Sequence, residues 1–242
     1  MFKTICNIII YLTCVYGFYY VIMAVFAFFK TKEVKIDDKK NYFSILIAAR
    51  NEEKVISALI ESLKKQNYDK KYYDINVIIN NCTDNTLKIA ENANVNVINC
   101  KTKISCKADA LRYAFEELKD KKIDAYVIFD ADNVVHPDFL KYMNYSINNG
   151  YKVAQGTRET KNLGQNWISS SYAIYYYLQN FFFSRSRKNL NLSNTINGTG
   201  FMVKKEVIDK YGFDTKTLTE DIEFSGICIL NGIKIDYVEK AI

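Results

Sequence analysis

Histidine, proline and paired cysteines are scarce in this sequence of 242 residues, which has one histidine, one proline and six cysteines. The single His136 excludes metal sites that need two histidines, such as the His-Glu-x-x-His zinc site. The cysteines form no Cys-x-x-Cys pair, which argues against a zinc ribbon or a disulfide scaffold and favours a reducing compartment. No dense block of lysine or arginine is present, so the formal charge of +6 suits an acidic lipid or a phosphorylated substrate, and no nucleic-acid partner is expected.

Hydrophobic residues make up 49% of the chain and charged residues 25%, so the chain is neither disordered nor collagen-like. The longest apolar run extends from Ile5 to Phe29 and contains no Asp, Glu, Lys or Arg. At about 1.5 Å per residue, a helix of this length spans a hydrocarbon core of roughly 30 Å. A cleaved signal peptide is the alternative, but it has a shorter apolar core and a small-residue cleavage site. We therefore predict an uncleaved transmembrane anchor over residues 1–30.

Lysines are distributed unevenly around this apolar run. Lys3 precedes it, and several lysines follow it closely: Lys30, Lys32, Lys35, Lys39 and Lys40. Because positive residues concentrate on the cytoplasmic side of membrane helices, the sequence predicts that everything after residue 30 is cytoplasmic. The protein is thus expected at the cell membrane, with a single span in this chain.

From about residue 41 the pattern changes to alternating strands and helices, which predicts one domain over residues 41–242. Short apolar runs indicate buried parallel strands: Phe43–Ala48, Ile75–Ile79, Val95–Ile98 and Tyr126–Phe129. Between them lie stretches whose apolar residues share one helical face: Val55 to Leu63, Leu87 to Ala93 and Ala110 to Leu118. Repeated strand–helix–strand units predict an open α/β sheet with right-handed crossovers, which binds ligands beyond the carboxyl ends of its strands.

Polar residues follow the predicted strands at the place where such a ligand would bind. The first strand is followed by Ala-Arg-Asn-Glu-Glu at 49–53, and the second by Asn-Asn-Cys-Thr-Asp at 80–84. An Asx turn with a helix N-cap explains the second segment equally well. Lys107 stands at the start of a predicted helix, where a cation is unfavourable unless an anion compensates it, so this lysine indicates a phosphate ligand.

The fourth strand ends in Asp-Ala-Asp, which directs Asp130 and Asp132 to the same crevice. Close carboxylates repel each other, and a hard divalent cation relieves this repulsion while it neutralises a bound diphosphate. A turn with two exposed acids is the structural alternative.

Three later segments each have a functional and a purely structural interpretation. Gly-Thr-Gly at 198–200 allows a backbone to approach a ligand closely, or it forms a turn. Thr-Glu-Asp at 219–221 starts a helix, and its acids are also ordinary for a first turn after a threonine N-cap. The aromatic stretch from Trp167 to Phe183 predicts a helix on the membrane surface, with lipid as its partner, or a buried helix with a basic end. Sugar stacking is a third interpretation of these aromatic rings.

The order of these motifs resembles that of the family-2 glycosyltransferases, specifically the membrane-anchored branch with cellulose-, hyaluronan- and poly-N-acetylglucosamine-synthase-like enzymes. The resemblance extends from about Phe43 to the end of the chain. It rests on Ala-Arg-Asn-Glu-Glu (49–53), Asn-Cys-Thr-Asp (81–84), Lys-Ala-Asp-Ala-Leu (107–111), Asp-Ala-Asp (130–132), Gly-Thr-Gly (198–200) and Thr-Glu-Asp (219–221). It implies a GT-A fold, in which helices flank a mixed, mostly parallel sheet. It also implies sugar transfer with inversion from a nucleotide-sugar, expected to be a UDP-sugar, to a glycan or lipid-linked acceptor.

The resemblance further implies roles for individual residues. Asp221 is expected to be the general base, with Glu220 beside it, and Asp132 and Asp130 are expected to hold Mn²⁺ or Mg²⁺. The acceptor side is expected at Gly198, Thr199 and Gly200. The nucleotide-sugar is expected to contact a larger set: Ala49, Arg50, Asn51, Glu52, Asn80, Asn81, Asp84, Lys107 and Asp130.

Three features depart from the family pattern. Asn80 stands where the family usually has an aspartate that contacts the base, and Cys106 stands where a glycine usually precedes the lysine. The family also continues into a Gln/Arg-x-x-Arg-Trp motif and further membrane helices, whereas this chain stops at Ile242, so the domain is expected to be incomplete at its C-terminus. An inactive or donor-binding remnant is therefore the alternative function. A sugar-nucleotidyltransferase on a similar α/β sheet is a further alternative. Such an enzyme would need a glycine-rich loop after the first strand, and residues 48–53 contain no glycine.

Overall fold

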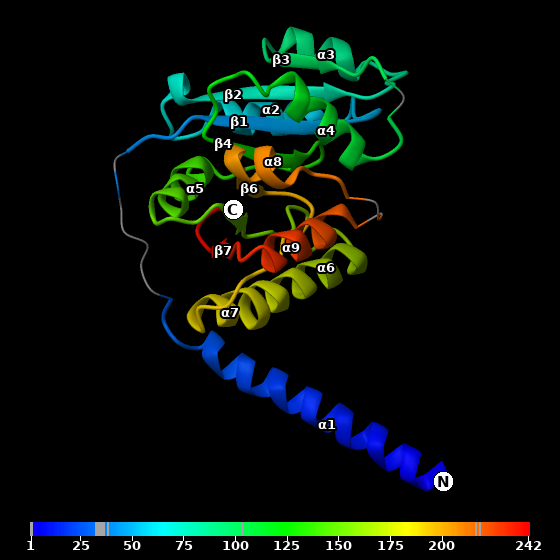
Figure 1. The fold of residues 1–242 in the computed structure, drawn as a ribbon. Helices are drawn as coiled ribbons and strands as arrows, with labels where there is room; N and C mark the ends of the chain where they lie inside the picture. Colours follow the sequence, from blue (N-terminus) through cyan, green and yellow to red (C-terminus); the bar gives the residue numbers. More distant parts are fainter. Residues whose placement is uncertain (1, 32–36, 38, 103, 216, 218) are drawn as a thin grey trace.

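The structure is a computed structural model that describes residues 2–31, 37, 39–102, 104–215, 217 and 219–242 (Figure 1). These residues form a seven-stranded sheet in the order β3-β2-β1-β4-β6-β5-β7. The strand bounds are β1 Phe43–Ala49, β2 Tyr73–Ile79, β3 Asn96–Asn99, β4 Ala125–Asp130, β5 Val153–Gly156, β6 Phe201–Lys204 and β7 Ile235–Val238.

One strand, β6, runs against the others. β1 pairs in parallel with β2 and β4, and β2 pairs in parallel with β3. β6 is antiparallel to both β4 and β5, and β5 is parallel to β7. The expected mixed, mostly parallel sheet with flanking helices is thus confirmed.

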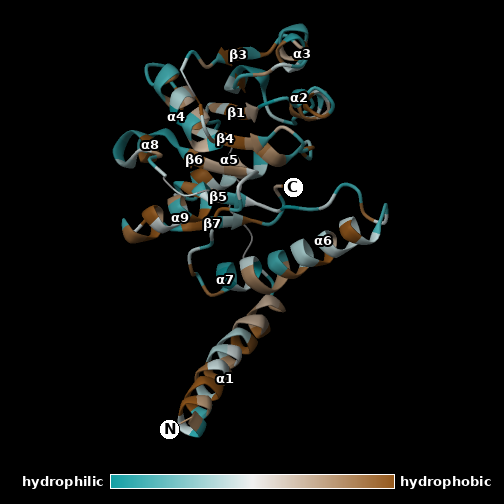
Figure 2. Ribbon diagram, turned by 90° about the vertical axis from the view of Figure 1, so that its right-hand side faces the viewer, coloured by the Kyte–Doolittle hydropathy of each residue, from teal (hydrophilic) through white to brown (hydrophobic). Residues whose placement is uncertain are grey.

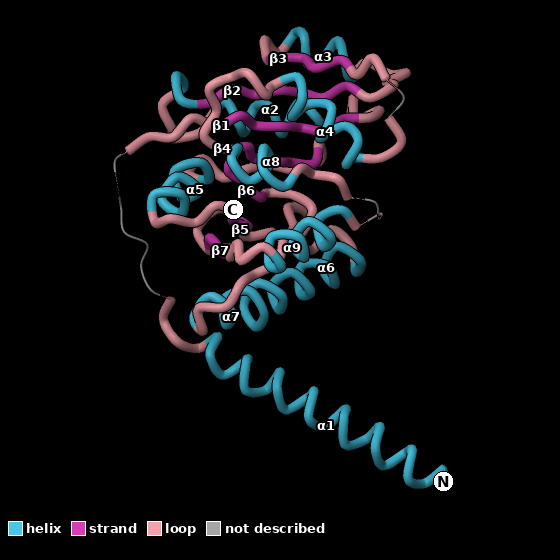
Figure 3. The backbone as a smooth tube through the Cα atoms, in the orientation of Figure 1, coloured by secondary structure: helices cyan, strands magenta, loops and turns pink. Residues whose placement is uncertain are grey.

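Helices cover both faces of the sheet (Figure 3). α2, α3 and α5 pack with one face, to which Ile45 and Ile47 of β1 belong, while α4, α8 and α9 pack with the other, to which Leu46 belongs. Because both faces are covered, β1 carries apolar residues on both faces, with Ser44 as its one polar residue, and does not alternate between apolar and polar positions. The helices are α1 Phe2–Ala27, α2 Ile56–Lys64, η1 Lys70–Tyr72, α3 Thr86–Asn92, α4 Lys107–Glu117, α5 Phe139–Asn148, α6 Trp167–Leu178, η2 Gln179–Arg185, α7 Ser186–Asn189, α8 Lys205–Tyr211 and α9 Glu220–Leu230.

The strands and helices predicted between residues 43 and 130 are all present, with boundaries shifted by one to three residues. β3 begins at Asn96, one residue later than predicted, and β2 begins earlier, at Tyr73. β4 extends to Asp130, so the first acid of Asp-Ala-Asp belongs to the strand, and its backbone is held by the sheet.

α1 is the one helix, within the described part of the chain, that is long and apolar enough to cross a membrane. It extends away from the sheet, and its surface is largely hydrophobic (Figures 1 and 2). Two of the lysines behind the predicted orientation, Lys32 and Lys35, lie outside the described residues. The cytoplasmic orientation therefore stays a prediction.

α6, η2 and α7 form one continuous helical segment that contacts the end of α1. The Asn189 side-chain amide donates to the carbonyls of Phe26 and Phe29 at 2.8 and 2.9 Å, and the rings of Phe28 and Phe181 lie 5.3 Å apart. No residue of α6 is buried. The buried-helix interpretation of the aromatic stretch is therefore wrong for α6, because this helix lies outside the core.

Candidate active site

The predicted site residues meet at one edge of the sheet because of the way β6 is paired. β1, β2 and β4 are parallel, so their carboxyl ends lie at the same edge. β6 is antiparallel to β4, with Phe201 paired to Ile128. The amino end of β6 and the preceding Gly-Thr-Gly therefore lie beside the carboxyl end of β4, although the two segments are far apart in the sequence.

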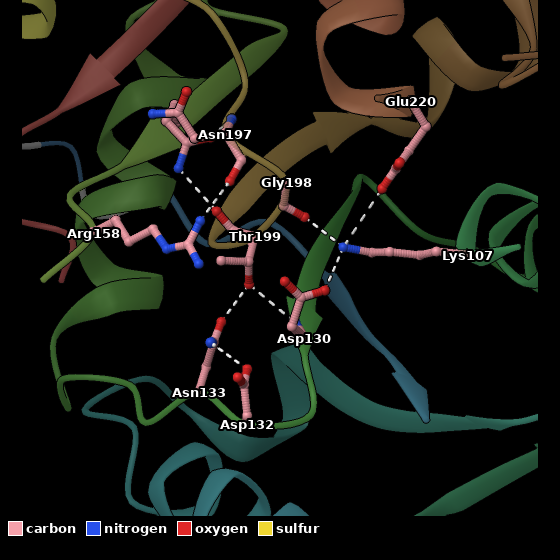
Figure 4. A network of polar contacts seen from close by, with 10 residues as sticks. Lys107, Asp130, Asp132, Asn133, Arg158, Asn197, Gly198, Thr199 and Glu220 are labelled. Carbon is pink, nitrogen blue, oxygen red and sulfur yellow. Dashed lines mark hydrogen bonds and ion pairs between the residues drawn. The ribbon is translucent and has the colours of Figure 1, made fainter. Parts of the chain in front are cut away.

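Lys107, the first residue of α4, is at the centre of this arrangement (Figure 4). Its Nζ donates to Asp130 Oδ1 at 2.5 Å and to the Gly198 carbonyl at 2.6 Å. The same nitrogen lies 3.8 Å from Glu220 Oε1. The anions that compensate this cation are thus the protein's own carboxylates. Its side chain is still 21% exposed, so a phosphate group has access to it.

Thr199 connects the Gly-Thr-Gly segment to the end of β4. Its Oγ1 accepts from the Asp130 backbone amide at 2.9 Å and donates to Asn133 Oδ1. The Asn133 side-chain amide donates in turn to Asp132 Oδ1 at 3.0 Å (Figure 4). Thr199 is 4% exposed, so its hydroxyl is occupied by hydrogen bonds to the end of β4 and to Asn133. Asn133 in turn orients Asp132. The sequence did not single out Asn133, although it directly follows the Asp-Ala-Asp motif.

Gln155 of β5 is a second residue that sequence reasoning missed. Its Oε1 accepts from the Asn197 amide at 2.8 Å, and its Nε2 donates to the Thr199 carbonyl at 2.9 Å. It is 1% exposed. A glutamine within a buried strand is the signal that points to it, because a buried amide must be paired. Its bonds hold the backbone on both sides of Gly198.

The loops after β1 and β2 are joined by hydrogen bonds between side chains and backbone. Asn51 Oδ1 accepts from the Thr83 amide at 2.8 Å, and Asp84 Oδ2 accepts from the Glu53 amide at 3.1 Å. Asp84 Oδ1 also accepts from the Thr86 amide at 3.0 Å, which is the predicted Asx turn. Asn51 and Asp84 therefore shape the loops in which a nucleotide is expected.

Asn80 has a buried side-chain oxygen without a partner in the described part of the chain. The residue is 7% exposed, and its Oδ1 accepts no hydrogen bond. An unpaired buried acceptor costs free energy, so this atom fits a ligand donor. The adjacent Asn81 has a left-handed φ of 46°, and Asn51 has one of 59°. Ala49 ends β1, and Arg50 lies exposed at the rim.

Carboxylates accumulate at this edge of the sheet. Burial raises the pKa of Glu52, and the charges of Asp132, Asp84 and Asp130 raise it further. Within residues that the structure describes, no three His, Cys, Asp or Glu side chains are arranged to hold a metal. Two hard carboxylates with excess negative potential nevertheless fit Mn²⁺ or Mg²⁺, whose remaining ligands would be water and phosphate oxygens.

Asp221 lies in the first turn of α9, against Gly198. A Cβ atom added to Gly198, which has a φ of +76°, would lie 3.4 Å from Asp221 Oδ2. Thr219 occupies the N-cap position, but its side chain makes no capping hydrogen bond. Among the described side chains Glu220 is near Lys107, whereas Asp221 makes no ion pair. The two adjacent acids thus have different surroundings.

A cavity of about 740 Å³ opens beside this edge. Asp132, Thr199 and Gly200 line one side of it, and α6 lines the other. The predicted acceptor-side residues Thr199 and Gly200 therefore face a cavity, whereas Gly198 faces Asp221.

Residues 40–242 match the family model described as glycosyltransferase like family 2, and the chain belongs to this family. The sheet topology and the motifs at its carboxyl edge agree with that membership. Among curated proteins, poly-beta-1,6-N-acetyl-D-glucosamine synthase of Staphylococcus aureus (strain COL) is 26% identical over 214 residues, which cover 86% of this chain and 50% of that protein. This chain thus spans about half the length of the curated relatives that it matches at this coverage.

Solved structures share the GT-A fold. The mannosyltransferase PcManGT from Pyrobaculum calidifontis, in complex with GDP-Man and Mn²⁺, has a TM-score of 0.74 at 14% identity and covers 92% of this chain and 62% of that one. Staphylococcus aureus TarS 1–349, in complex with UDP-GlcNAc, has a TM-score of 0.62 at 19% identity and covers 82% of this chain and 56% of that one. At these identities the similarity establishes the fold alone.

Proposed function

We propose that this chain transfers a sugar, with inversion, from a nucleoside diphosphate sugar to a glycan or lipid-linked acceptor at the cytoplasmic face of the membrane. The observation that carries the proposal is the convergence of Lys107, Asp130 and Asp221 around Gly198. This arrangement combines a cation for a diphosphate with a carboxylate free of ion pairs among the described residues. Membership of the family and the similarity to a polysaccharide synthase support the same activity.

The proposed reaction separates the base from the leaving group. Asp221 takes the proton of an acceptor hydroxyl while the hydroxyl oxygen forms its bond to the anomeric carbon. The bond from that carbon to the diphosphate oxygen breaks, and the electron pair leaves with the diphosphate. Lys107 stabilises the charge that develops there. General-base assistance of this kind contributes roughly 10²- to 10⁴-fold.

Asp132 and Asp130 are the residues that would hold the divalent cation. A cation bound there would neutralise charge on the departing diphosphate. Asn133 restricts the Asp132 carboxylate through its amide, and Thr199 restricts Asn133. This support keeps the carboxylate in place before a ligand binds.

Uridine is the nucleoside that we propose for the donor. The N3–H group of uracil is a donor, and Asn80 Oδ1 is a buried acceptor that lacks a partner among the described residues. The UDP-GlcNAc bound to TarS and the N-acetylglucosamine polymer of the curated relative support a UDP-linked N-acetylhexosamine.

Two surfaces support attachment to the membrane. α1 is long enough to span the bilayer, and its end contacts the segment that continues α6. On α6, a stripe that faces away from the cavity is exposed: Trp167 at 78%, Ile174 at 62%, Tyr177 at 63% and Leu178 at 46%. Tryptophan and tyrosine favour the interface between lipid and water, so we assign this stripe to the lipid headgroup region.

Calorimetry of donor binding tests the function. UDP-GlcNAc should bind in the presence of Mn²⁺ and bind at least about tenfold more weakly with chelator, because a carboxylate pair next to a diphosphate needs a cation. Asp132→Asn should weaken binding similarly, and the exposed Asp120→Asn should not. Equal binding with and without chelator would contradict the dependence on a divalent cation. Absence of any nucleotide-sugar binding would contradict the proposed function. Transfer of N-acetylglucosamine by the same protein distinguishes an enzyme from a donor-binding remnant.

A further inference from the structure

The cavity beside the carboxyl end of β4 has a mixed aromatic and polar lining. Its near end is formed by Asp132, Thr199 and Gly200, and its far wall by one face of α6. The loop of residues 157–162, between β5 and α6, closes a third side. The cavity is therefore continuous with the residues assigned to the metal and the acceptor side.

α6 presents two different faces, as a helical period of 3.6 residues requires. One face lines the cavity through Ile168, Ser169, Tyr172 and Tyr176, which are spaced as neighbours on consecutive turns. The stripe assigned to the membrane lies on the opposite side. The aromatic residues of α6 thus lie on two surfaces. Contact with lipid accounts for those of the outer stripe but not for those that line the cavity.

The tyrosines of the cavity face are held in place. The rings of Tyr172 and Tyr176 stack with centroids 6.2 Å apart and an interplanar angle of 28°. The Arg158 guanidinium lies 4.7 Å from the Tyr176 ring centroid, and it donates to the Asn197 carbonyl at 3.4 Å. Asn197 directly precedes Gly198, so the tyrosine wall is connected to the backbone beside Asp221. Tyr172 remains 56% exposed and has ring surface available to a ligand.

Polar groups line the same space, and one of them is buried without a partner among the described residues. Thr160 Oγ1 is buried and has no hydrogen-bond partner in the described part of the chain, and the exposed residues Asn162 and Gln165 also line the cavity. A cavity with aromatic rings and a few polar groups is typical of an oriented small-molecule site. Pyranose rings match such a cavity, because their C–H faces stack on aromatic rings while the hydroxyl groups at their rim form hydrogen bonds.

We propose that this cavity is the acceptor subsite and that it binds a saccharide whose ring lies on Tyr172, with Tyr176 behind it and Thr160 bonded to a ring hydroxyl. The proposal rests on the proposed function and adds the chemical class of the acceptor and the residues that select it. Tyr172 and Thr160 are specificity residues. The cavity reaches Thr199, and the preceding Gly198 lies against Asp221, so the reacting hydroxyl would have to extend from the cavity to this glycine.

The test uses the full chain in detergent micelles and a short N-acetylglucosamine oligomer as the probe. Tyr172→Ala should raise the KM for the oligomer, and its Kd measured without donor, by roughly fivefold or more, a factor typical of the loss of one aromatic contact. Binding of UDP-GlcNAc should not change. Tyr172→Phe should keep most of the affinity because the ring is retained. Leu163→Ala is the control, since Leu163 belongs to the loop beside the cavity and is 71% exposed but does not line the cavity.

Thr160→Val separates a ligand contact from a structural role. A hydroxyl that serves the fold would lower the Tm when removed, whereas an unpaired hydroxyl should leave the Tm unchanged or higher and weaken only oligomer binding. Unchanged oligomer binding in both Tyr172→Ala and Thr160→Val would overturn the subsite. Competition by a long-chain alkyl phosphate without sugar, at lower concentration than the oligomer, would overturn it in favour of lipid. If the wild-type chain binds the oligomer at Tyr172 but transfers nothing to it, the proposed function fails while the subsite stands.

Discussion

At the residue scale, the site is organised by a lysine that contacts two carboxylates and a carbonyl. Lys107 restrains Asp130 and lies near Glu220, whereas the adjacent Asp221 makes no ion pair with a described residue. On this asymmetry rests our proposal of different roles for the neighbouring acids, in which Glu220 supports the lysine and Asp221 acts on a substrate. It leads to a prediction that distinguishes binding from chemistry.

Asp221→Asn should reduce sugar transfer by roughly 10²-fold or more while donor affinity survives, because an amide has nearly the same volume but cannot accept the proton. Initial rates of transfer and calorimetry of UDP-GlcNAc measure the two quantities. Glu220→Gln is the comparison. Near-wild-type transfer by Asp221→Asn, together with loss of transfer in Glu220→Gln, would show that the base has been assigned to the wrong acid.

The crowding of acids around Glu52 predicts a pH-dependent stability. Its pKa in the folded chain lies above the ordinary value of 4.5, so the ionised form is penalised on folding. Glu52→Gln should therefore raise the Tm near neutral pH, and the gain should disappear below the ordinary pKa, where both states are protonated. Melting curves between pH 4 and 8 without divalent cation measure this difference. An equal gain at every pH would contradict it, and the exposed Glu61→Gln serves as the control.

At the scale of elements, α6 connects two features of the molecule. It lines the cavity, and the segment that continues it contacts α1. Its outer stripe has the composition of a membrane interface, and it continues through η2 into α7, which contacts α1. Figure 1 shows α6 and α7 at the side of the domain from which α1 departs. The proposed membrane attachment and the proposed acceptor cavity thus share one helix.

Trp167 is the only tryptophan in the chain and is 78% exposed, so its fluorescence reports on α6 directly. In lipid bilayers its emission should shift to shorter wavelength and be quenched by brominated lipids, because the indole favours the headgroup region. Full quenching by aqueous acrylamide with no response to brominated lipid would contradict the assignment. The same protein in lipid-free detergent gives the reference emission with which the emission in bilayers is compared.

At the scale of the whole molecule, α1 is held against the sheet domain by side-chain contacts as well as linked to it through the chain. Glu239, just beyond β7, accepts from Thr31 at 3.1 Å and pairs with Arg185 at 3.2 Å. Lys188 of α7 pairs with the buried Asp236 of β7 at 3.1 Å. These contacts connect the end of α1, the η2–α7 segment and the last strand. The domain should therefore keep a constant orientation to the membrane.

The orientation itself gives a topological prediction. Because lysines follow α1 and only Lys3 precedes it, a tag placed after Ile242 should resist protease added to intact cells and be digested after the cells are opened. Western blotting of the tag measures this. Digestion in intact cells would reverse the orientation, and a second tag at the N-terminus provides the opposite control.

The sequence alone determined the local features, because these depend on periodicity and residue type. The apolar run of α1, the buried strands from Phe43 to Asp130 and the acids at the end of β4 are all visible in short windows. Tertiary structure decided what those windows cannot encode. The antiparallel pairing of β6 brings Gly198 and Asp221 to β4, Gln155 and Asn133 fix the backbone and side chains there, and α6 closes a cavity. Each of these depends on contacts between segments far apart in the chain, whose pairing and register are set by the packed sheet.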